Sequence, residues 1–290
     1  MTGRAGAGAS LLHKKNPRVT IRMTPAPTAA AATPIPAASV REIQALMGLT
    51  PEQANVTLQL ISLAENGEPR WWNHYGYIER LGDGRGYTAT IFGACSGTGD
   101  LAMVLDELAD IAPGHALLQY RAALKKCKGE RVDGIQGMLG AVPRLNGDEA
   151  WRRAVWAVYL KLYWKFAAAF AAKTGECARR PGPPLTTALA KGFLVDTAIN
   201  HGADMGSFRP ILDRMDKAAD GVDEADEADW LRRFVGARKR LLKSGFQDLD
   251  TSGTGDRCAL WMRLLKEGNL ALRPPIKARA GYWGRGLVVA

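Results

Sequence analysis

The sequence predicts an α+β fold that is predominantly helical. Apolar residues recur at roughly helical spacing over residues 56–63, a β-hairpin pattern occupies residues 76–92, and helical patterns account for most of the chain after residue 100. A single hairpin among many helices is typical of α+β proteins. With 290 residues, the chain is long enough to bury a substantial core.

The first 40 residues are predicted to form a tail. They contain five basic residues (Arg4, Lys14, Lys15, Arg18 and Arg22) and no acidic ones. Residues 24–38 are an Ala/Pro/Thr tract, which cannot form a packed core and is typical of a linker. The basic residues fit the start of an export signal, but prolines interrupt any apolar segment, so a cleavable signal, a disordered tail and a misplaced start all stay open. We expect one folded domain over residues 41–290.

The helix predicted around residues 56–63 should end at Asn66-Gly67. Glycine tolerates the left-handed conformation of a helix C-cap, and Pro69 prevents the helix from continuing. Glu65 therefore lies at or near the C-terminus of this helix, where the helix dipole opposes a negative charge. Such a position favours the protonated carboxyl group, which is suited to act as a general acid.

The hairpin follows directly. Residues 76–81 and 87–92 are rich in aromatic and β-branched residues, and they flank the glycine-rich turn 82–86. Asp83 projects from this turn, eighteen positions after Glu65 (83 − 65 = 18). Two carboxyl groups in unlike environments are what the hydrolysis of a glycosidic bond requires.

Helices joined by loops should form the rest of the chain. Residues 96–100 are predicted to supply an N-cap for a helix over residues 100–111. Further helices are predicted over 115–128, 149–173, 185–200, 208–219, 226–246 and 256–267, with loops at 128–148 and 179–184 and an extended surface tail from residue 270. The helix over 149–173 carries an aromatic stripe that we interpret as core rather than as a sugar platform: Trp151, Val155, Trp156, Val158, Tyr159, Leu162, Tyr163 and Phe166.

Charge is unevenly distributed along the chain. The formal net charge is +10, yet residues 41–110 hold ten acidic residues against four arginines. A high overall pI is typical of proteins that bind nucleic acid or an anionic surface. A ligand meets the local charge, however, so the acidic segment favours a cationic polymer and argues against nucleic acid. No apolar run approaches the length of a transmembrane helix, and we expect no membrane partner.

Four short motifs stand between residues 64 and 100: Ala64-Glu65-Asn66, Tyr77-Ile78-Glu79, Gly82-Asp83-Gly84-Arg85-Gly86-Tyr87-Thr88 and Cys95-Ser96-Gly97-Thr98-Gly99-Asp100. Together they resemble the glycoside hydrolase family 46 chitosanases. The likeness is dense over residues 54–125 and thinner around 195–202, 236–239 and 268–275. It implies one catalytic domain of two mainly helical lobes flanking a cleft, similar to lysozyme-type folds, with the hairpin lining the cleft.

The resemblance also implies an activity. It is that of an endo-acting, inverting hydrolase, which cleaves β-1,4 linkages between the glucosamine units of chitosan and needs no cofactor. Glu65 matches the general acid, Asp83 matches the general base, and Thr88 matches a residue that helps to hold the attacking water. Family and polymeric substrate together lead us to expect a secreted protein, and we expect a monomer.

Two other functions stay open. One is the hydrolysis of N-acetylated polymers such as chitin or peptidoglycan, which the same two carboxyl groups could perform. Asp100 distinguishes acetylated from deacetylated substrates, because an acetamide group carries no charge that could pair with a carboxylate. The other is a non-catalytic module that binds polyanions, which the basic remainder of the chain leaves open.

Further site residues follow from the family's pattern. Asp100 matches a position that binds the ammonium group of a glucosamine unit. Three more residues match substrate contacts: Asn66, Tyr77 and His201. Arg80 stands where the family commonly has an acid, so we expect it to weaken the negative field near the cleft.

Arginines are expected to support both carboxyl groups. Arg85 lies two residues from Asp83 and either keeps that carboxylate ionised or serves only the turn; it is also expected among the substrate-binding residues. The family's pattern also implies a network behind the catalytic groups in which Asp196 joins two arginines. Arg238 matches one of them, whereas Arg257 lies near the second position but out of register.

No metal or nucleotide site is predicted. The cysteines form no C-x-x-C pair and histidine is scarce, which argues against zinc. Residues 248–259 resemble only half of a calcium-binding loop, since Ala259 stands where glutamate is needed. The glycines near residue 84 match no phosphate-binding motif. Disulfides and buried free thiols stay equally open for the four cysteines: Cys95, Cys127, Cys177 and Cys258.

Overall fold

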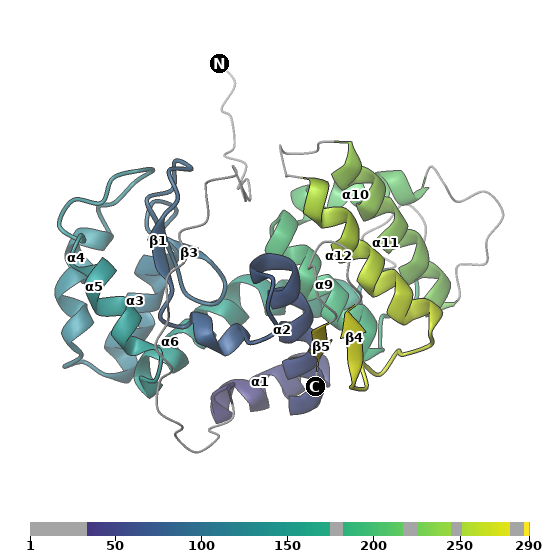
Figure 1. Ribbon diagram of the computed structural model, residues 1–290, viewed down its shortest axis with the longest axis horizontal. Helices are drawn as coiled ribbons and strands as arrows, with labels where there is room; N and C mark the ends of the chain where they lie inside the picture. Colours follow the sequence, from purple (N-terminus) through teal and green to yellow (C-terminus); the bar gives the residue numbers. More distant parts are fainter. Residues whose placement is uncertain (1–33, 175–181, 217–225, 245–250, 279–286, 290) are drawn as a thin grey trace.

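The computed structural model of the chain describes residues 34–174, 182–216, 226–244, 251–278 and 287–289 (Figure 1). Its first part comprises α1 (Ala37–Met47), α2 (Pro51–Asn66), η1 (Trp71–His74), β1 (Ile78–Arg80), β2 (Tyr87–Ala89), β3 (Ala94–Cys95) and α3 (Asp100–Ile111). The middle part comprises η2 (Ala116–Tyr120), α4 (Arg121–Leu124), α5 (Met138–Ala141), η3 (Val142–Leu145), α6 (Glu149–Tyr159), the π-helical segment η4 (Leu160–Trp164) and α7 (Lys165–Ala172). The last part comprises α9 (Ala188–His201), α10 (Met205–Asp216), α11 (Glu227–Lys243), α12 (Thr251–Lys266), β4 (Ile276–Ala278) and β5 (Leu287–Val289).

These elements form two groups. In Figure 1, α3, α4, α5 and the sheet β1–β3 lie on one side, α9–α12 with β4 and β5 lie on the other, and α2 and α6 run between them. Contacts join α6 to α3 and α2 to α9, so each central helix packs on one of the groups. The predicted class, a mainly helical α+β fold with a small antiparallel sheet, is confirmed.

Helix α2 carries Glu65 in its last turn. Thr50 caps its start, because the Thr50 hydroxyl accepts the Gln53 N–H while the Gln53 side chain accepts the Thr50 N–H. Gly67, with φ of 72°, ends the helix where the sequence predicted. Residues 56–63 are all buried, so this helix is enclosed on nearly every side.

The predicted hairpin is present, and a third strand joins it. The sequence did not predict β3, which is only two residues long. The strands pair antiparallel, with Glu79 opposite Thr88 and Thr88 opposite Cys95. Because successive residues of a strand point to opposite faces, these three residues share one face of the sheet. Arg80 and Tyr87, which are paired in the same ladder, share the other face.

Several predicted helices differ from the observed ones. The segment 115–128 forms two short helices, η2 and α4, and the predicted loop 128–148 contains α5 and η3. The N-cap of α3 is Gly99, which lies in the predicted segment 96–100, and no side chain caps this helix. The long helix over 149–173 is present, but residues 160–164 adopt π-helical geometry. Short helical segments gain little from intrinsic propensity, so packing sets their boundaries.

The ends of the described chain also differ from the prediction. Residues 37–40, predicted as tail, form the start of α1, because neighbouring Ile35 and Ser39 are buried against the domain. Residues 1–33 of the predicted tail and residues 179–181 of the predicted loop at 179–184 lie outside the described residues. The predicted surface tail after residue 270 instead pairs β4 with β5, and it buries apolar side chains: Ile276, Ala278 and Val289.

The aromatic stripe of the long helix is core, as predicted. Trp151, Trp156 and Trp164 are completely buried, and the indole N–H of Trp151 donates to the Tyr75 carbonyl at 2.8 Å. Tyr163 is only half-buried. Leu162 and Phe166 are likewise half-buried, whereas Trp164 within the π-helical segment and Phe170 beyond it are buried. Tyr163 thus lies in a π-helical segment, a geometry that often marks functional positions.

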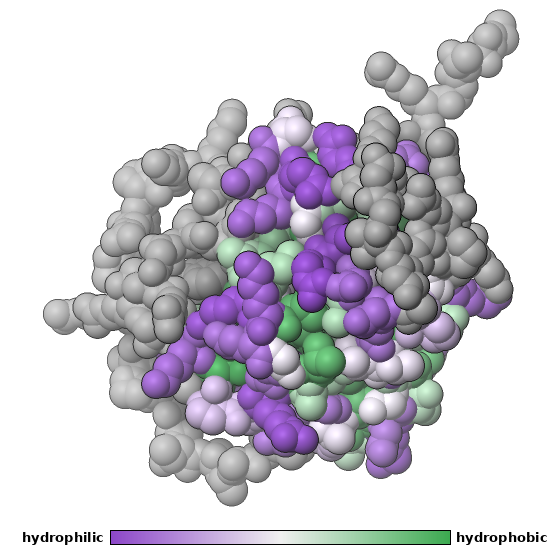
Figure 2. Space-filling view, turned by 90° about the vertical axis from the view of Figure 1, so that its right-hand side faces the viewer, coloured by the Kyte–Doolittle hydropathy of each residue, from purple (hydrophilic) through white to green (hydrophobic). Residues whose placement is uncertain are grey.

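The outer face of the second group is amphipathic. Trp230, Phe234 and Leu241 of α11 are buried, whereas Arg232 and Arg240 of the same helix are exposed. Figure 2 shows hydrophilic residues spread over this face with apolar residues visible between them. Arg232 and Arg240 thus lie on the solvent side of this helix, as on an ordinary solvated helix face, whereas Arg238 of the same helix is buried.

The described residues bear on the cysteine, metal and membrane predictions. Cys95, Cys127 and Cys258 are buried free thiols, and Cys177 lies outside the described part of the chain. Within that part, no group of three His, Cys, Asp or Glu residues could hold a metal ion. The described helices also include none that is long and apolar enough to cross a membrane.

Candidate active site

An arginine in the protein interior hydrogen-bonds the carboxyl group of Glu65. Its Oε1 accepts a 2.5 Å hydrogen bond from Nη1 of Arg257, a residue of α12 that lies 192 positions later in the chain. The Glu65 side chain remains 18% exposed, whereas Arg257 is buried. Glu65 is therefore an accessible carboxyl group with a buried cation behind it.

Arg257 connects Glu65 to a buried ionic network. Its Nε donates to Asp196 Oδ1 at 2.6 Å, and Asp196 Oδ2 accepts from Arg238 Nη1 at 2.5 Å. Arg238 also donates to Asn200 Oδ1 at 2.9 Å. Asp196 and Arg238 are completely buried, and buried charges persist only when they are paired. When Glu65 is ionised, four charges thus alternate in sign from the surface into the interior.

The network explains why Arg257 stays charged. Burial lowers the pKa of Arg257, but the charges of Asp196 and Glu65, with their hydrogen bonds, outweigh burial and raise it. The sequence paired Asp196 with Arg238 and left the second arginine without a match. That arginine is Arg257, whose position depends on the packing of α12 against α11 and α9 rather than on sequence register.

Asp83 is held by its own arginine within the hairpin turn. Its Oδ2 accepts from Nη2 and Nε of Arg85 at 2.6 and 2.9 Å, and its Oδ1 accepts the Arg85 N–H at 3.1 Å. The Asp83 side chain is 10% exposed. Burial lowers the pKa of Arg85, but the hydrogen bond to Asp83 and the surrounding charges outweigh burial and raise it. Arg85 therefore pairs directly with the Asp83 carboxylate within the turn.

Polar groups line the sheet face next to this turn. Thr88 is buried, and its Oγ1 lies 3.5 Å from Cys95 Sγ. Tyr77 donates its hydroxyl to Glu79 Oε2 at 3.1 Å. Burial raises the pKa of Tyr77, and the charges of Glu79 and Asp83 raise it further. Tyr77 therefore lies in the field of both carboxylates.

Arg80 does not lie on this face, and its predicted weakening of the local negative field stays a prediction. Strand alternation turns Arg80 toward the opposite side of the sheet from Thr88. There its Nη2 donates to the Glu130 carbonyl oxygen at 3.4 Å and lies 4.0 Å from Glu130 Oε2. Its charge is paired away from the candidate catalytic groups.

Asp100 and Tyr163 lie near both halves of the site. Asp100 begins α3, is half-buried, and accepts the Thr98 hydroxyl at 2.8 Å. Burial raises the pKa of Tyr163; the charges of Asp100 and Glu65 raise it further, and that of Arg85 opposes the rise. Tyr163 was predicted to lie in the core, and the only signal against this was its hydroxyl group.

The two remaining predicted contacts differ in accessibility. Asn66 is the last residue of α2; it is exposed, and its Nδ2 donates to Ser62 Oγ at 3.2 Å. His201 is completely buried, and its pKa is lowered to about 2 by burial and by the charges of Arg238 and Arg257. The last turn of α9 therefore places His201 against the ionic network, and its predicted contact with a ligand is wrong for this structure.

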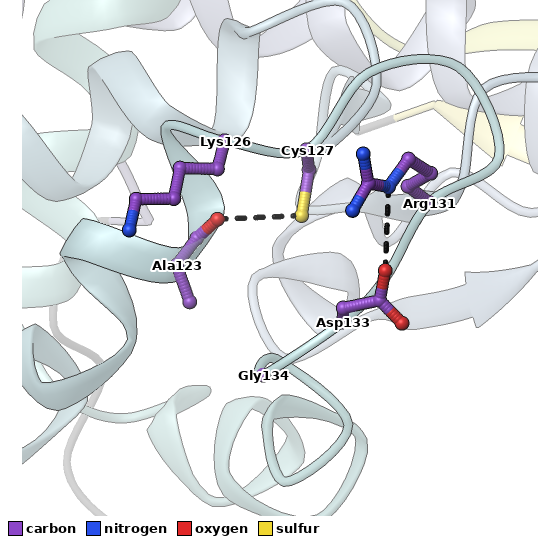
Figure 3. A pocket seen from close by; sticks show the side chains of 6 residues that line it. All are labelled: Ala123, Lys126, Cys127, Arg131, Asp133 and Gly134. Atoms are coloured by element: carbon purple, nitrogen blue, oxygen red, sulfur yellow. Dashed lines mark hydrogen bonds and ion pairs between the residues drawn. The ribbon is translucent and has the colours of Figure 1, made fainter.

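Two neighbouring cavities share Arg131 and Asp133 in their linings. One has a volume of about 560 Å³ and also reaches Arg80 and Tyr87. The other has a volume of about 380 Å³ and is shown in Figure 3, with its lining residues: Ala123, Lys126, Cys127, Arg131, Asp133 and Gly134. Neither cavity contains a candidate catalytic carboxyl group, so neither is the candidate active site.

Two accessible carboxyl groups, each held by a different arginine, stand on a mainly helical fold with a small sheet. This arrangement fits a glycoside hydrolase of the two-carboxyl type. The family model of glycosyl hydrolase family 46 matches residues 59–276, and the chain belongs to that family. The match includes every candidate site residue described above.

Curated relatives agree with this membership. The chain is 31% identical over 258 residues to a chitosanase of Bacillus subtilis (strain 168), a match that covers 83% of this chain and 87% of the relative. It is 32% identical over 232 residues to a chitosanase of Streptomyces sp. (strain N174), covering 78% and 79% of the two chains.

Solved structures show the same similarity. The native chitosanase from Bacillus subtilis MY002 superposes with a TM-score of 0.69 at 29% identity, covering 84% of this chain and all of that one. A mutant of that enzyme, complexed with six GlcN, gives the same values. A family 46 chitosanase of Gynuella sunshinyii in complex with chitotetraose gives a TM-score of 0.67 at 27% identity, covering 83% and 99%.

Proposed function

We propose that this protein is a chitosanase that cleaves β-1,4 linkages between glucosamine units within the chitosan chain and inverts the anomeric configuration. The observation that carries the proposal is the pair of differently held carboxyl groups, Glu65 with Arg257 and Asp83 with Arg85. Relatives that are named chitosanases, and a similar structure complexed with GlcN units, support the choice of substrate.

Glu65 is the proposed general acid. Arg257 occupies Oε1, so the proton that Glu65 donates to the leaving glycosidic oxygen is assigned to Oε2. When Glu65 gives up this proton, Arg257 stabilises the resulting carboxylate. Asp196 and Arg238 hold Arg257 in place and charged. Proton donation thus leaves a negative charge on Glu65, next to the positive charge of Arg257.

Asp83 is the proposed general base. Arg85 donates two side-chain hydrogen bonds to its carboxylate. Asp83 takes a proton from a water that attacks the anomeric carbon from the face opposite to Glu65, and Thr88 helps to hold that water. Such single displacement inverts the configuration and needs carboxyl groups about 6.5–9.5 Å apart to leave room for the water. No cofactor takes part.

Asp100 is the proposed reader of the substrate amine. Its carboxylate is half-buried at the start of α3, where a glucosamine ammonium can form a charge-assisted hydrogen bond with it. Tyr77 and Asn66 are proposed as further substrate contacts, and His201 is left out because it is buried. We also propose that the protein acts outside the cell, because a polymeric substrate does not cross membranes. We propose further that it is a monomer, and size-exclusion chromatography tests this oligomeric state.

The decisive experiment incubates the protein with fully deacetylated chitosan and, separately, with chitin. Viscosity and reducing ends are followed, and NMR records the anomer released first. A rapid fall of viscosity on chitosan alone, with inversion, is expected. Glu65→Gln and Asp83→Asn should each abolish hydrolysis without changing the fold. Near-normal turnover in either variant, or cleavage of chitin alone, would contradict the proposal.

A further inference from the structure

The turn that carries Asp83 is not fixed by the sheet itself. Strand β1 ends at Arg80 and β2 begins at Tyr87, so residues 81–86 lie outside the ladder. Three of these six are glycines with φ of 69°, 86° and 76°, a composition with large conformational freedom unless other contacts restrict it. Arg85 fixes Asp83 only to the turn, because both residues belong to it. Some other group must fix the turn to the protein.

Residues 128–133 pack against this turn from outside the hairpin. The Gly129 N–H donates to the Gly97 carbonyl at 3.3 Å, and the Gly97 N–H donates to the Arg85 carbonyl at 2.9 Å. A Cβ at Gly97 would overlap the carbonyl oxygen of Gly129, so this close approach of two backbones requires glycine. The segment 128–133 is thus held next to the turn by backbone contacts.

Glu130 is the residue of this segment that reaches the turn with its side chain. Its Oε1 accepts the N–H of Gly84, the residue directly after Asp83, at 3.1 Å. Its carbonyl oxygen accepts from Arg80 Nη2 at 3.4 Å, and its Oε2 lies 4.0 Å from the same nitrogen. Glu130 therefore contacts the chain on both sides of Asp83, at the end of β1 and within the turn.

We propose that Glu130 is a positioning residue for Asp83, a role that rests on the proposed function of Asp83 as general base. A base must lie within hydrogen-bond distance of the proton that it takes, and small displacements of reacting groups reduce the rate steeply. The Glu130 side chain is 55% exposed, so its contacts add little to the stability of the fold. Its loss should change turnover and leave the melting temperature unchanged.

Glu130→Ala tests this role by removing the acceptor of the Gly84 N–H. We expect kcat on chitosan to fall about tenfold with KM and Tm unchanged. Glu130→Gln places an amide oxygen where the carboxylate oxygen accepts the Gly84 N–H, and it should retain most of the kcat that Glu130→Ala loses. Asp133→Asn is the matched control, because Asp133 is an exposed carboxylate of the same segment that pairs with Arg131 and not with the turn. This control should behave as wild type.

Wild-type kcat in Glu130→Ala would overturn the proposal. So would a loss of activity accompanied by a lower Tm and not recovered by Glu130→Gln, because that pattern indicates a purely structural role. Asp83→Asn keeps the two hypotheses apart. If Asp83→Asn retains turnover, the assignment of the base fails; if Asp83→Asn is inactive while Glu130→Ala is fully active, only the positioning role fails.

Discussion

Nη1 of Arg257 and Oε1 of Glu65 are 2.5 Å apart, although 192 positions separate the two residues in the chain. The same guanidinium donates to Asp196 at 2.6 Å. Arg257 therefore has two tasks at once: it occupies one oxygen of the proposed acid, and it neutralises a completely buried carboxylate. Arginine can do both, because its guanidinium group presents several donors in a rigid planar fork.

Replacement of Arg257 should separate these two tasks. Arg257→Lys keeps a charge but cannot reach Glu65 and Asp196 together, so we expect kcat to fall about 100-fold or more. Arg257→Ala leaves Asp196 with Arg238 alone, and breaking a buried ion pair typically costs about 3–5 kcal/mol of stability. Kinetics on chitosan and thermal unfolding measure the two effects. Lys266→Ala, at an exposed position of the same helix, is the control.

The Arg257 prediction has a clear contrary result. If Arg257→Lys turned over chitosan at a near-normal rate, the contact with Glu65 would have no part in proton transfer. If Arg257→Ala melted at the wild-type temperature, the buried charge of Asp196 would have found another partner.

Asp100→Asn should weaken chitosan binding. The substitution keeps the shape of the side chain and removes the charge that pairs with a glucosamine ammonium. A hydrogen bond to a charged group contributes about 1.5–3 kcal/mol, so we expect KM to rise about tenfold or more. Asp110→Asn, an exposed position of the same helix, should leave KM unchanged. An unchanged KM in Asp100→Asn would remove Asp100 from the substrate site.

Tyr163→Phe tests a residue that the sequence analysis treated as core. The hydroxyl responds to the charges of both Glu65 and Asp100, whereas the ring packs edge-on against Phe92 and Tyr159 with centroids 5.9 and 5.8 Å away. Phenylalanine keeps the packing and loses the hydroxyl. We expect kcat/KM to fall about tenfold at an unchanged Tm; a wild-type kcat/KM would return Tyr163 to a purely structural role.

Stability should depend on pH through Glu227. Its carboxylate accepts the Thr187 N–H at 2.9 Å and the hydroxyls of Thr187 and Thr186 at 2.7 Å each. Burial alone raises the pKa of Glu227, but these hydrogen bonds outweigh it and lower the pKa below its ordinary value. A group with a lowered pKa in the folded state stabilises the protein above its unfolded pKa, and this contribution disappears as the pH falls through the folded pKa.

Urea unfolding of wild type and Glu227→Gln over a pH series measures this contribution. The difference in unfolding free energy should be largest above about pH 5 and should shrink as the pH falls below about 4. A difference that stays constant from pH 7 to pH 3 would contradict the sign of the pKa shift. Glu267→Gln, an exposed glutamate after α12, serves as the control.

Local signals in the sequence account for the elements that carry the proposed catalytic pair. Gly67 ends α2 because a positive φ is required there, and this places Glu65 in the last turn. Glycines with positive φ close the turn around Asp83. Such features depend on neighbours within a few positions, so a single sequence is sufficient to predict them. Strand β3 was missed because two residues carry no recognisable pattern.

The partners of these groups depend on the tertiary structure. Arg257 reaches Glu65, His201 is buried against the arginines, and Glu130 contacts the turn of Asp83. Each of these contacts joins segments that are distant in the chain, and its geometry follows from how helices and loops pack.

The sequence by itself therefore determined the mainly helical α+β class, the hairpin, and the two carboxyl groups that the family match also covers. Only the tertiary structure decided which arginine supports Glu65, which face of the sheet Arg80 occupies, and that His201 is inaccessible. The physical reason is the range of the interactions. Caps, turns and strand alternation are set by local backbone geometry, whereas burial and ion pairing are set by the packing of the whole chain.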